Sequence, residues 1–233
     1  MKSPILGSAY VARSVNAADN RMVNLFPEVV QEGKEAAFLQ RTPGLRLRCT
    51  LGTGPIRGMN AFGGYLYVVS GTTLYQVAPS YNSTTLGTVA NDGPVSMANN
   101  GTQLFVACHG PSFIYDTSTA AFAQITDVDF PGALTVSYLD GYFVFNEPNS
   151  QKFWVTESYN GLAIDSLAFA SAEGSPDNLV TLIVDHREVW LFGTNSIEVW
   201  YDAGTPDFPL ARIQGAFNEI GCLAAYSVAK LDN

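Results

Sequence analysis

Charged residues are scarce in this chain of 233 residues, since Asp, Glu, Lys and Arg together make up only 14% of it. An average globular domain has about 25%. Basic residues are the scarcest, with 12 Lys and Arg against 21 Asp and Glu and a net charge of −9. This balance argues against bulk attraction to nucleic acid or to an anionic membrane surface. We therefore expect no tight direct binding of DNA. Because no run of about 18 apolar residues occurs, we also expect no membrane partner.

Cysteine and histidine are too few and too scattered to indicate a metal or redox site. Cys49, Cys108 and Cys222 are widely spaced and none belongs to a CxxC pair, so we expect buried free thiols. His186 falls in a predicted turn. His109 follows Cys108 directly, and adjacent side chains on a strand point to opposite faces, which disfavours a thiolate–imidazole pair. The sequence thus predicts no catalytic residue, no cofactor and no metal site.

Aromatic and β-branched residues, by contrast, are abundant and recur along the chain. Four segments share a turn followed by a strand with an aromatic residue inside it: 63–69, 101–107, 139–145 and 185–192. Aligning these segments places Tyr67, Phe105, Phe143 and Trp190 in one register, at spacings of 38, 38 and 47 residues. We expect these four residues to be buried at equivalent positions in successive units, because a repeat of this length is typical of stacked structural units.

Each unit carries three further predicted strands, one before the aromatic strand and two after it. The first strands are 56–62, 95–98, 134–139 and 179–184; the third are 73–77, 113–115, 152–156 and 196–200; the fourth are 84–89, 121–125, 167–170 and 210–214. Four short strands per unit of about 40 residues indicate an all-β fold of the β-propeller type. The blades are expected at 56–92, 93–130, 131–176 and 177–216, with a partial blade at 217–233. A β-sandwich with irregular spacing is the structural alternative.

The two ends of the chain stand outside the four complete units. Residues 1–55 are interpreted as an extended N-terminal arm with polar anchors, followed by a closing strand at 45–51. The segment 28–39 offers the only plausible helix, but Gly33 lies in its middle and a loop or short turn is the prediction. Residues 226–231 are expected to form the first strand of a fifth blade. The hypothesis is an incomplete propeller: a longer native polypeptide, or an open arc whose edges other chains cover and which tends to aggregate alone.

Several motifs resemble those of one family. In the arm they are residues 16–20, the pattern Arg21-x-x-Asn24-Leu25-x-Pro27-Glu28, and the run 42–45; in the fourth unit they are 193–201 and 214–216. Together they resemble the packaged-DNA stabilisation proteins, also called tail hub or nozzle proteins, of short-tailed bacteriophages, over most of the chain. The resemblance implies a structural virion protein without enzymatic activity. It also implies that the protein is made in the host cytoplasm and is then located in the phage tail.

The same resemblance implies the partners. A ring of copies, a hexamer in the family, is expected below the portal and adaptor proteins, where a tail needle or fibre protein closes the channel and retains the packaged DNA. Within the arm, polar side chains alternate with apolar ones, which suits an ordered segment anchored by hydrogen bonds. The residues predicted to form the interface are Arg13, Asn16, Arg21, Asn24 and Phe26.

Two other functions fit a propeller and stay open at this stage. One is a carbohydrate-binding propeller that uses exposed aromatic residues, although aromatics on repeat strands more often form the core between blades. The other is a glycan-cleaving propeller, whose two carboxylates would have to come from different blades. The Ser-x-Asp-x-Gly-x-x-Trp box of sialidase propellers is absent from the sequence.

Overall fold

The computed structural model describes residues 23–29, 37–90, 93–206 and 208–231. The chain divides into two compact units, Met1–Arg48 and Cys49–Asn233. Within the described ranges all the secondary-structure elements are β-strands, which confirms the predicted all-β class.

The described part of the N-terminal unit is a two-stranded antiparallel sheet of β1 (Leu25–Val29) and β2 (Ala37–Arg41). The prediction of a loop or short turn over 28–39 is therefore wrong at both ends of that range, where the chain is strand. The alternation of side chains around Phe26 and Leu39 has the period of two that a strand requires. Thr42 closes the base of the hairpin by donating from its backbone N and its Oγ1 to Asn24 O, at 3.0 and 3.2 Å.

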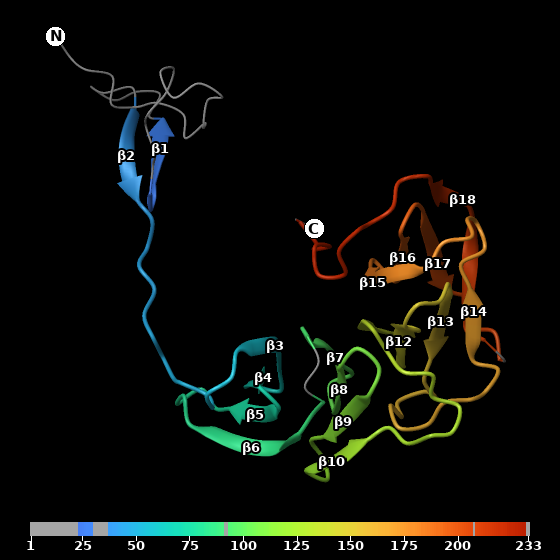
Figure 1. Cartoon of the computed structure of the whole chain (residues 1–233), viewed down its shortest axis with the longest axis horizontal. Coiled ribbons are helices and arrows are strands. Elements are labelled where there is room, and N and C mark those ends of the chain that lie inside the picture. Colours follow the sequence, from blue (N-terminus) through green and yellow to red (C-terminus); the bar gives the residue numbers. More distant parts are fainter. Residues whose placement is uncertain (1–22, 30–36, 91–92, 207, 232–233) are drawn as a thin grey trace. The chain divides into compact units, whose positions relative to one another are not determined.

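The C-terminal unit contains four sheets of four antiparallel strands each (Figure 1). We number these sheets blades 1 to 4 in chain order. Blade 1 has β3 (Ile56–Phe62), β4 (Tyr65–Ser70), β5 (Thr73–Val77) and β6 (Ser83–Thr88). Blade 2 has β7 (Ser96–Asn99), β8 (Gln103–Ala107), β9 (Ser112–Asp116) and β10 (Ala121–Gln124). Blade 3 has β11 (Val136–Leu139), β12 (Tyr142–Asn146), β13 (Lys152–Val155) and β14 (Phe169–Ser171). Blade 4 has β15 (Leu179–Asp185), β16 (Glu188–Gly193), β17 (Ile197–Asp202) and β18 (Leu210–Asn218).

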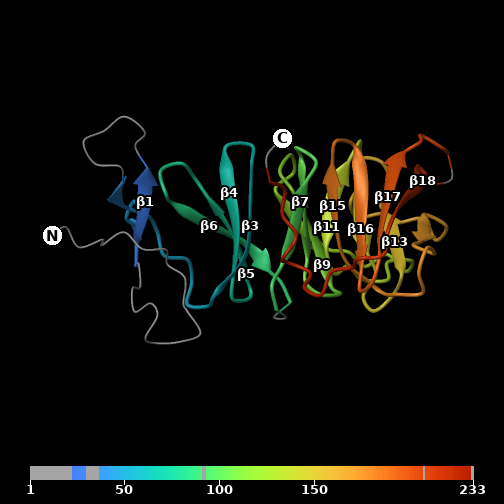
Figure 2. The same ribbon diagram turned by 90° about the horizontal axis from the view of Figure 1, so that it is seen from above.

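The blades follow the chain in space as they do in sequence, as the turned view also shows (Figure 2). The first strand of each blade contacts the first strand of the next, so that β3 meets β7, β7 meets β11 and β11 meets β15. These four strands are therefore the inner strands of a β-propeller, which confirms the predicted fold. Within the described residues the four blades do not close a ring.

Tight turns join the first two strands of the blades and explain why the repeat was visible in the sequence. In blades 1, 3 and 4 both turn residues have positive φ: Gly63 and Gly64, Asp140 and Gly141, and His186 and Arg187. Two successive residues with positive φ are the requirement of a type I′ hairpin turn, which favours Gly, Asn and Asp. The interpretation of His186 as a turn residue is confirmed.

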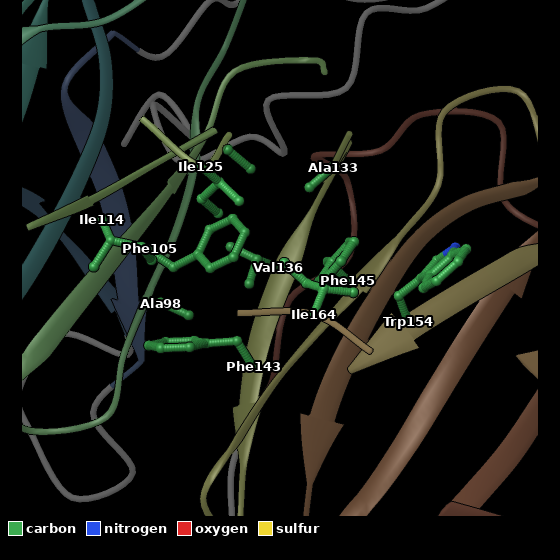
Figure 3. Packing of buried hydrophobic residues seen from close by; sticks show 11 residues of the cluster. Ala98, Phe105, Ile114, Ile125, Ala133, Val136, Phe143, Phe145, Trp154 and Ile164 are labelled. Carbon is green, nitrogen blue, oxygen red and sulfur yellow. The ribbon is translucent and has the colours of Figure 1, made fainter. Parts of the chain in front are cut away.

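Apolar side chains fill the space between successive blades, and each interface contains an aromatic pair. Ring centroids lie 5.8 Å apart for Tyr67–Tyr115 between blades 1 and 2, 5.4 Å for Phe105–Phe143 between blades 2 and 3, and 5.0 Å for Phe153–Trp200 between blades 3 and 4. Figure 3 shows the cluster of buried residues between blades 2 and 3, where residues of β8 and β12 pack against Val136 and Ile125. A blade thus buries its faces only against its neighbours.

The predicted common register of four buried aromatics is correct for two residues and needs correction for the others. Tyr67 and Phe105 are buried and contact the following blade. Phe143 is buried but faces the preceding blade, because it lies one residue closer to its turn; Val144 is the residue that faces blade 4. Trp190 has the register of Tyr67, but it is 36% exposed because no described blade follows blade 4.

Two predicted strands are absent. Residues 45–51, predicted as a closing strand, have no strand structure; Leu51 is buried instead against Val68 and Val77 on blade 1. Residues 226–231, predicted to begin a fifth blade, are likewise without strand structure. An alternating pattern forms a strand only when a sheet edge pairs with its backbone, and neither segment has such a partner within the described residues.

Hydrogen bonds between buried polar groups also connect the blades. Asn146 Oδ1 in blade 3 accepts from Thr135 N at 2.9 Å and from Thr135 Oγ1 at 2.7 Å, while Asn146 Nδ2 donates to Leu179 O in blade 4 at 3.3 Å. Gln103 in blade 2 accepts at Oε1 from Gly161 N, which belongs to the loop after β13, at 2.9 Å. Satisfied polar groups of this kind favour one register of blade against blade.

Asp116 gives the stability of the propeller a pH dependence. Its carboxylate accepts hydrogen bonds from Ser118 Oγ at 2.5 Å and from Gln103 Nε2 at 3.2 Å, and these bonds, that of Ser118 first, lower the pKa of Asp116 from 3.8 to about 2. Because the folded pKa is lower than the unfolded one, this contribution is complete above about pH 4 and is lost as the pH falls toward 2. We expect Asp116→Asn to lack this part of the acid dependence in urea unfolding from pH 2 to 7. If the free energy of unfolding fell equally with decreasing pH in the wild type and in Asp116→Asn, the assignment to Asp116 would be contradicted.

Candidate interface

Three of the five predicted interface residues, Arg13, Asn16 and Arg21, lie outside the described residues. The other two are in the N-terminal hairpin. Asn24 has a φ of 55°, in the left-handed region that Asn tolerates, and its carbonyl oxygen holds Thr42 at the base of the hairpin. Phe26 projects from β1 and is 43% exposed. The structure thus gives Asn24 a role within the hairpin and leaves Phe26 as a residue available for contact.

The hairpin carries apolar side chains on both faces. The register pairs Phe26 with Gln40 and Glu28 with Phe38, so that Phe26 and Phe38 share one face; both are exposed. Leu25 and Leu39, on the other face, are half-buried. A two-stranded hairpin alone is marginally stable in water. Its exposed phenylalanines are therefore candidates for contact with another surface.

The segment that follows the hairpin is extended and alternates apolar with basic residues. Leu45 and Leu47 are among the most exposed large apolar side chains of the chain, at 105% and 81%. Arg46 lies between them, and its side chain is exposed as well. We call residues 23–48, as far as they are described, the arm surface. Its exposed side chains include Phe26 and Phe38 on one face of the hairpin, Arg41 on the other face, and Leu45, Arg46 and Leu47 in the segment that follows.

Blade 4 presents a second surface on the face turned away from blade 3. The register of its strands places Asp185, Glu188 and Tyr201 in one row, and Ile183, Trp190 and Val199 in the next. Trp190 Nε1 donates to Glu188 Oε2 at 3.2 Å, and Tyr201 is 43% exposed. We call this surface the blade 4 outer face. It combines exposed aromatic rings with carboxylates.

The tail after β18 covers part of this face and then reaches blade 2. Cys222 N donates to Gly193 O at 2.8 Å, and Tyr226 Oη donates to Pro94 O at 3.2 Å while its ring stacks on His109. Burial raises the pKa of Tyr226 to about 12, so its hydroxyl stays protonated at neutral pH. The tail therefore connects blade 4 to the loop that precedes blade 2, which no strand prediction anticipated.

The tail then returns to the inner strand of blade 4. Lys230 Nζ lies 3.2 Å from Asp185 Oδ1, and Val228 and Leu231 line a hollow with Trp190. Hydrogen bonds from His186 and Lys230 lower the pKa of the Asp185 carboxyl. Asp185 is thus ionised at neutral pH, and its charge is paired with Lys230 of the tail.

Blade 1 has an uncovered face as well, on the side opposite to blade 2. Met59 and Leu66 are exposed there, and a hollow at its edge is lined by Ala61, Leu66 and Val77. This surface is apolar and lacks the carboxylates of the blade 4 outer face at the residues named.

The two units of the chain differ strongly in charge. Residues 1–48 contain seven Lys and Arg against four Asp and Glu, a net charge of +3. Residues 49–233 contain five Lys and Arg against 17 Asp and Glu, a net charge of −12. The overall value of −9 therefore hides a basic arm and an acidic propeller. Counting charges by segment would have found this contrast from the sequence.

The described residues contain no group of three or more His, Cys, Asp or Glu side chains that could hold a metal ion. No helix there is long and apolar enough to cross a membrane. No disulfide joins Cys49, Cys108 and Cys222, and the expected burial holds for Cys108 only, because Cys49 and Cys222 are half-buried.

Comparison with known proteins defines the class first and the family next. Four-stranded antiparallel blades around inner strands make the chain a β-propeller protein. The whole chain, residues 1–233, matches the family described as "Bacteriophage P22 Gp10, beta-propeller". The chain belongs to this family, and it is a bacteriophage structural protein and virion component. Comparison with curated proteins gave no match.

Solved structures share the fold at low sequence identity. The computationally designed Ika8 protein aligns with a TM-score of 0.53 and 11% identity, over 91% of this chain and 64% of that one. YCF48 bound to D1 peptide aligns with a TM-score of 0.50 and 13% identity, over 75% and 56%. An extracellular domain of BT4673 from B. thetaiotaomicron also has a TM-score of 0.50 and 13% identity, over 68% and 22%. The chain spans less than two thirds of each of these structures, and the likeness concerns the fold alone.

Proposed function

We propose that this protein is a subunit of the tail hub of a short-tailed phage, where a ring of copies closes the portal channel and retains the packaged DNA. The observation that carries the proposal is the match of residues 1–233 to a phage propeller family. The expected contacts are with further copies of the chain, with the portal and adaptor proteins above, and with a tail needle or fibre protein below.

The charge of the propeller supports a steric mode of DNA retention. A channel lined with dense Lys and Arg would hold DNA tightly through release of counterions, and would oppose its passage. The propeller unit, residues 49–233, has a net charge of −12. A ring built from such acidic units lets a duplex slide until another component blocks it.

The decisive experiment is electron microscopy of the purified protein, alone and mixed with the portal–adaptor assembly. We expect ring-shaped oligomers that add to the end of that assembly. Monomers that bind glycans on an array would support the carbohydrate-binding alternative instead. Turnover of a chromogenic glycoside, lost on mutation of an acidic residue, would support the glycan-cleaving one.

A second measurement tests the steric mode. We expect duplex DNA to bind the protein no more tightly than about 10⁻⁴ to 10⁻⁶ M, the range of non-specific binding at physiological salt. Fluorescence anisotropy with a labelled duplex at two salt concentrations measures this. Nanomolar binding that weakens steeply with salt would overturn the steric mode.

A further inference from the structure

We propose that a pocket between blades 3 and 4 binds a neutral saccharide. The pocket has a volume of about 220 Å³, and it lies between the loop that joins β13 to β14 and the loop that joins β17 to β18. Both blades are described and pack on each other through a common apolar cluster, so the pocket does not depend on either edge of the open arc. The inference goes beyond the proposed function, because assembly of copies does not require a ligand at this place.

The wall that blade 3 contributes is long and is fixed by hydrogen bonds. It has 13 residues, 156–168, whereas the corresponding loops of blades 1, 2 and 4 have 5, 4 and 7 residues. Tyr159 N donates to Gly141 O at 2.8 Å, and Gly161 N donates to Gln103 Oε1 at 2.9 Å. Long ordered loops in compact domains usually carry function. This wall is therefore in place before a ligand arrives, as in most small-molecule sites.

Four polar side chains that line the pocket have unused hydrogen-bonding capacity. Glu157 and Asp165 supply carboxylates, and Tyr142 and Ser158 supply hydroxyls. Among the described residues, the Glu157 carboxylate and both hydroxyls have no hydrogen-bond or ionic partner, and Asp165 accepts only from Leu167 N, through Oδ1 at 2.8 Å. Two carboxylates and two hydroxyls make a lining rich in acceptors. Such a lining suits a ligand with several O–H donors, because hydrogen bonds to an ionised acceptor are the stronger ones.

The remaining lining is apolar, which selects among ligands rich in hydroxyl groups. Pro206 and Pro209 come from the loop of blade 4, and the ring of Tyr142 packs against the apolar cluster between the two blades. A pyranose ring has C–H groups on its faces and hydroxyl groups around its edge. It therefore matches a pocket with apolar walls and a few polar groups, which is the usual composition of a ligand site.

Charge excludes an acidic sugar or a phosphate. No Lys, Arg or His lines the pocket, so an anion would meet Glu157 and Asp165 without a compensating positive charge. A cationic ligand, such as an arginine side chain of another protein, would pair with the carboxylates. It would leave the hydroxyls and the proline wall without a partner, and the neutral saccharide is therefore the ligand assigned.

Glycan binding by the full-length chain tests the assignment. The probe is an array of neutral and acidic oligosaccharides, followed by titration calorimetry with the neutral oligosaccharide that gives the strongest signal. We expect Glu157→Gln and Asp165→Asn each to bind it about tenfold more weakly, because an amide replaces an ionised acceptor. Glu173→Gln changes an exposed carboxylate that does not line the pocket, and we expect unchanged binding. Thermal unfolding of each variant establishes that the chain is folded.

The contrary outcomes are distinct from those of the tail-hub proposal. Absence of neutral-sugar binding at millimolar concentrations, or binding of acidic sugars alone, overturns the inference. Neutral-sugar binding that survives both pocket substitutions overturns the site. Binding of argininamide that the two substitutions weaken, without binding of any neutral sugar, reassigns the pocket to a basic side chain and overturns the saccharide. Rings that bind no sugar leave the tail-hub proposal intact, and sugar-binding monomers support the pocket while contradicting the ring.

Discussion

Replacing Phe143 with alanine is expected to lower the free energy of unfolding by about 3–5 kcal/mol, the usual loss for a large aromatic residue in a core. Phe143 is fully buried, and its ring lies 5.4 Å from Phe105 of blade 2 and 5.7 Å from Tyr138 of its own blade. Its contacts therefore hold blade 3 against blade 2, and a cavity there weakens two blades at once (Figure 3). Urea unfolding followed by tryptophan fluorescence measures the loss.

Trp190→Ala is the matched control for this experiment. Trp190 occupies the second strand of blade 4, as Phe143 occupies that of blade 3, and is the larger side chain. Because it is 36% exposed and no described blade covers it, we expect Trp190→Ala to cost less than Phe143→Ala. The signal for this variant is circular dichroism, since the substitution removes a fluorophore. Equal losses for the two substitutions would show that Trp190 is covered like the other aromatic residues.

Replacing Glu198 with alanine is expected to destabilise the protein by about 1–3 kcal/mol, the cost of leaving buried donors without their acceptor. The Glu198 side chain is 1% exposed, and its Oε2 lies 3.3 Å from Arg212 Nε. It also accepts hydrogen bonds from Trp200 Nε1 at 3.1 Å and from Gly174 N at 2.5 Å. The substitution leaves a guanidinium and two donors without this acceptor in the interface of blades 3 and 4.

Two further variants serve as comparisons, one at Glu198 and one at a neighbouring exposed carboxylate. Glu198→Gln keeps the size and one acceptor oxygen but removes the charge, so we expect an intermediate loss. Glu173→Ala removes an exposed carboxylate one residue from Gly174, and we expect a change within about 0.5 kcal/mol. Chemical unfolding of the three proteins at pH 7 gives the comparison. A Glu198→Ala variant as stable as Glu173→Ala would show that the buried pair contributes nothing.

The repeat along the chain was sufficient to predict the propeller. The strands β3 and β5 have the predicted bounds of 56–62 and 73–77, because turns that contain Gly or Pro flank each strand. Other strands begin or end one or two residues away, and β18 extends to Asn218, beyond the expected blade limit at 216. Local turn chemistry and a period of two are properties of a few adjacent residues, and they are therefore readable without knowledge of the rest of the fold.

The candidate interface was predicted only in small part. Phe26 was identified from the mixture of polar and apolar residues in the arm, and it is exposed on β1. Trp190 and Tyr201 were missed as surface residues, because an aromatic residue on a blade strand has the same local sequence whether a neighbour covers it or not. Exposure depends on the presence of a following blade, which is a property of the assembly of strands and not of any one of them.

The sequence by itself determined the strand order, the inner hairpin turns and the acidic balance of the propeller, since each of these depends on residues close together in the chain. The tertiary structure alone decided which way Phe143 faces, because one residue fewer after the turn moves a side chain to the other face of its strand. It also decided that residues 45–51 and 226–231 do not form strands, because within the described residues their alternating patterns have no sheet edge to pair with. Pairing of backbone groups far apart in sequence, and not side-chain pattern, makes a strand, and only the folded chain supplies that pairing.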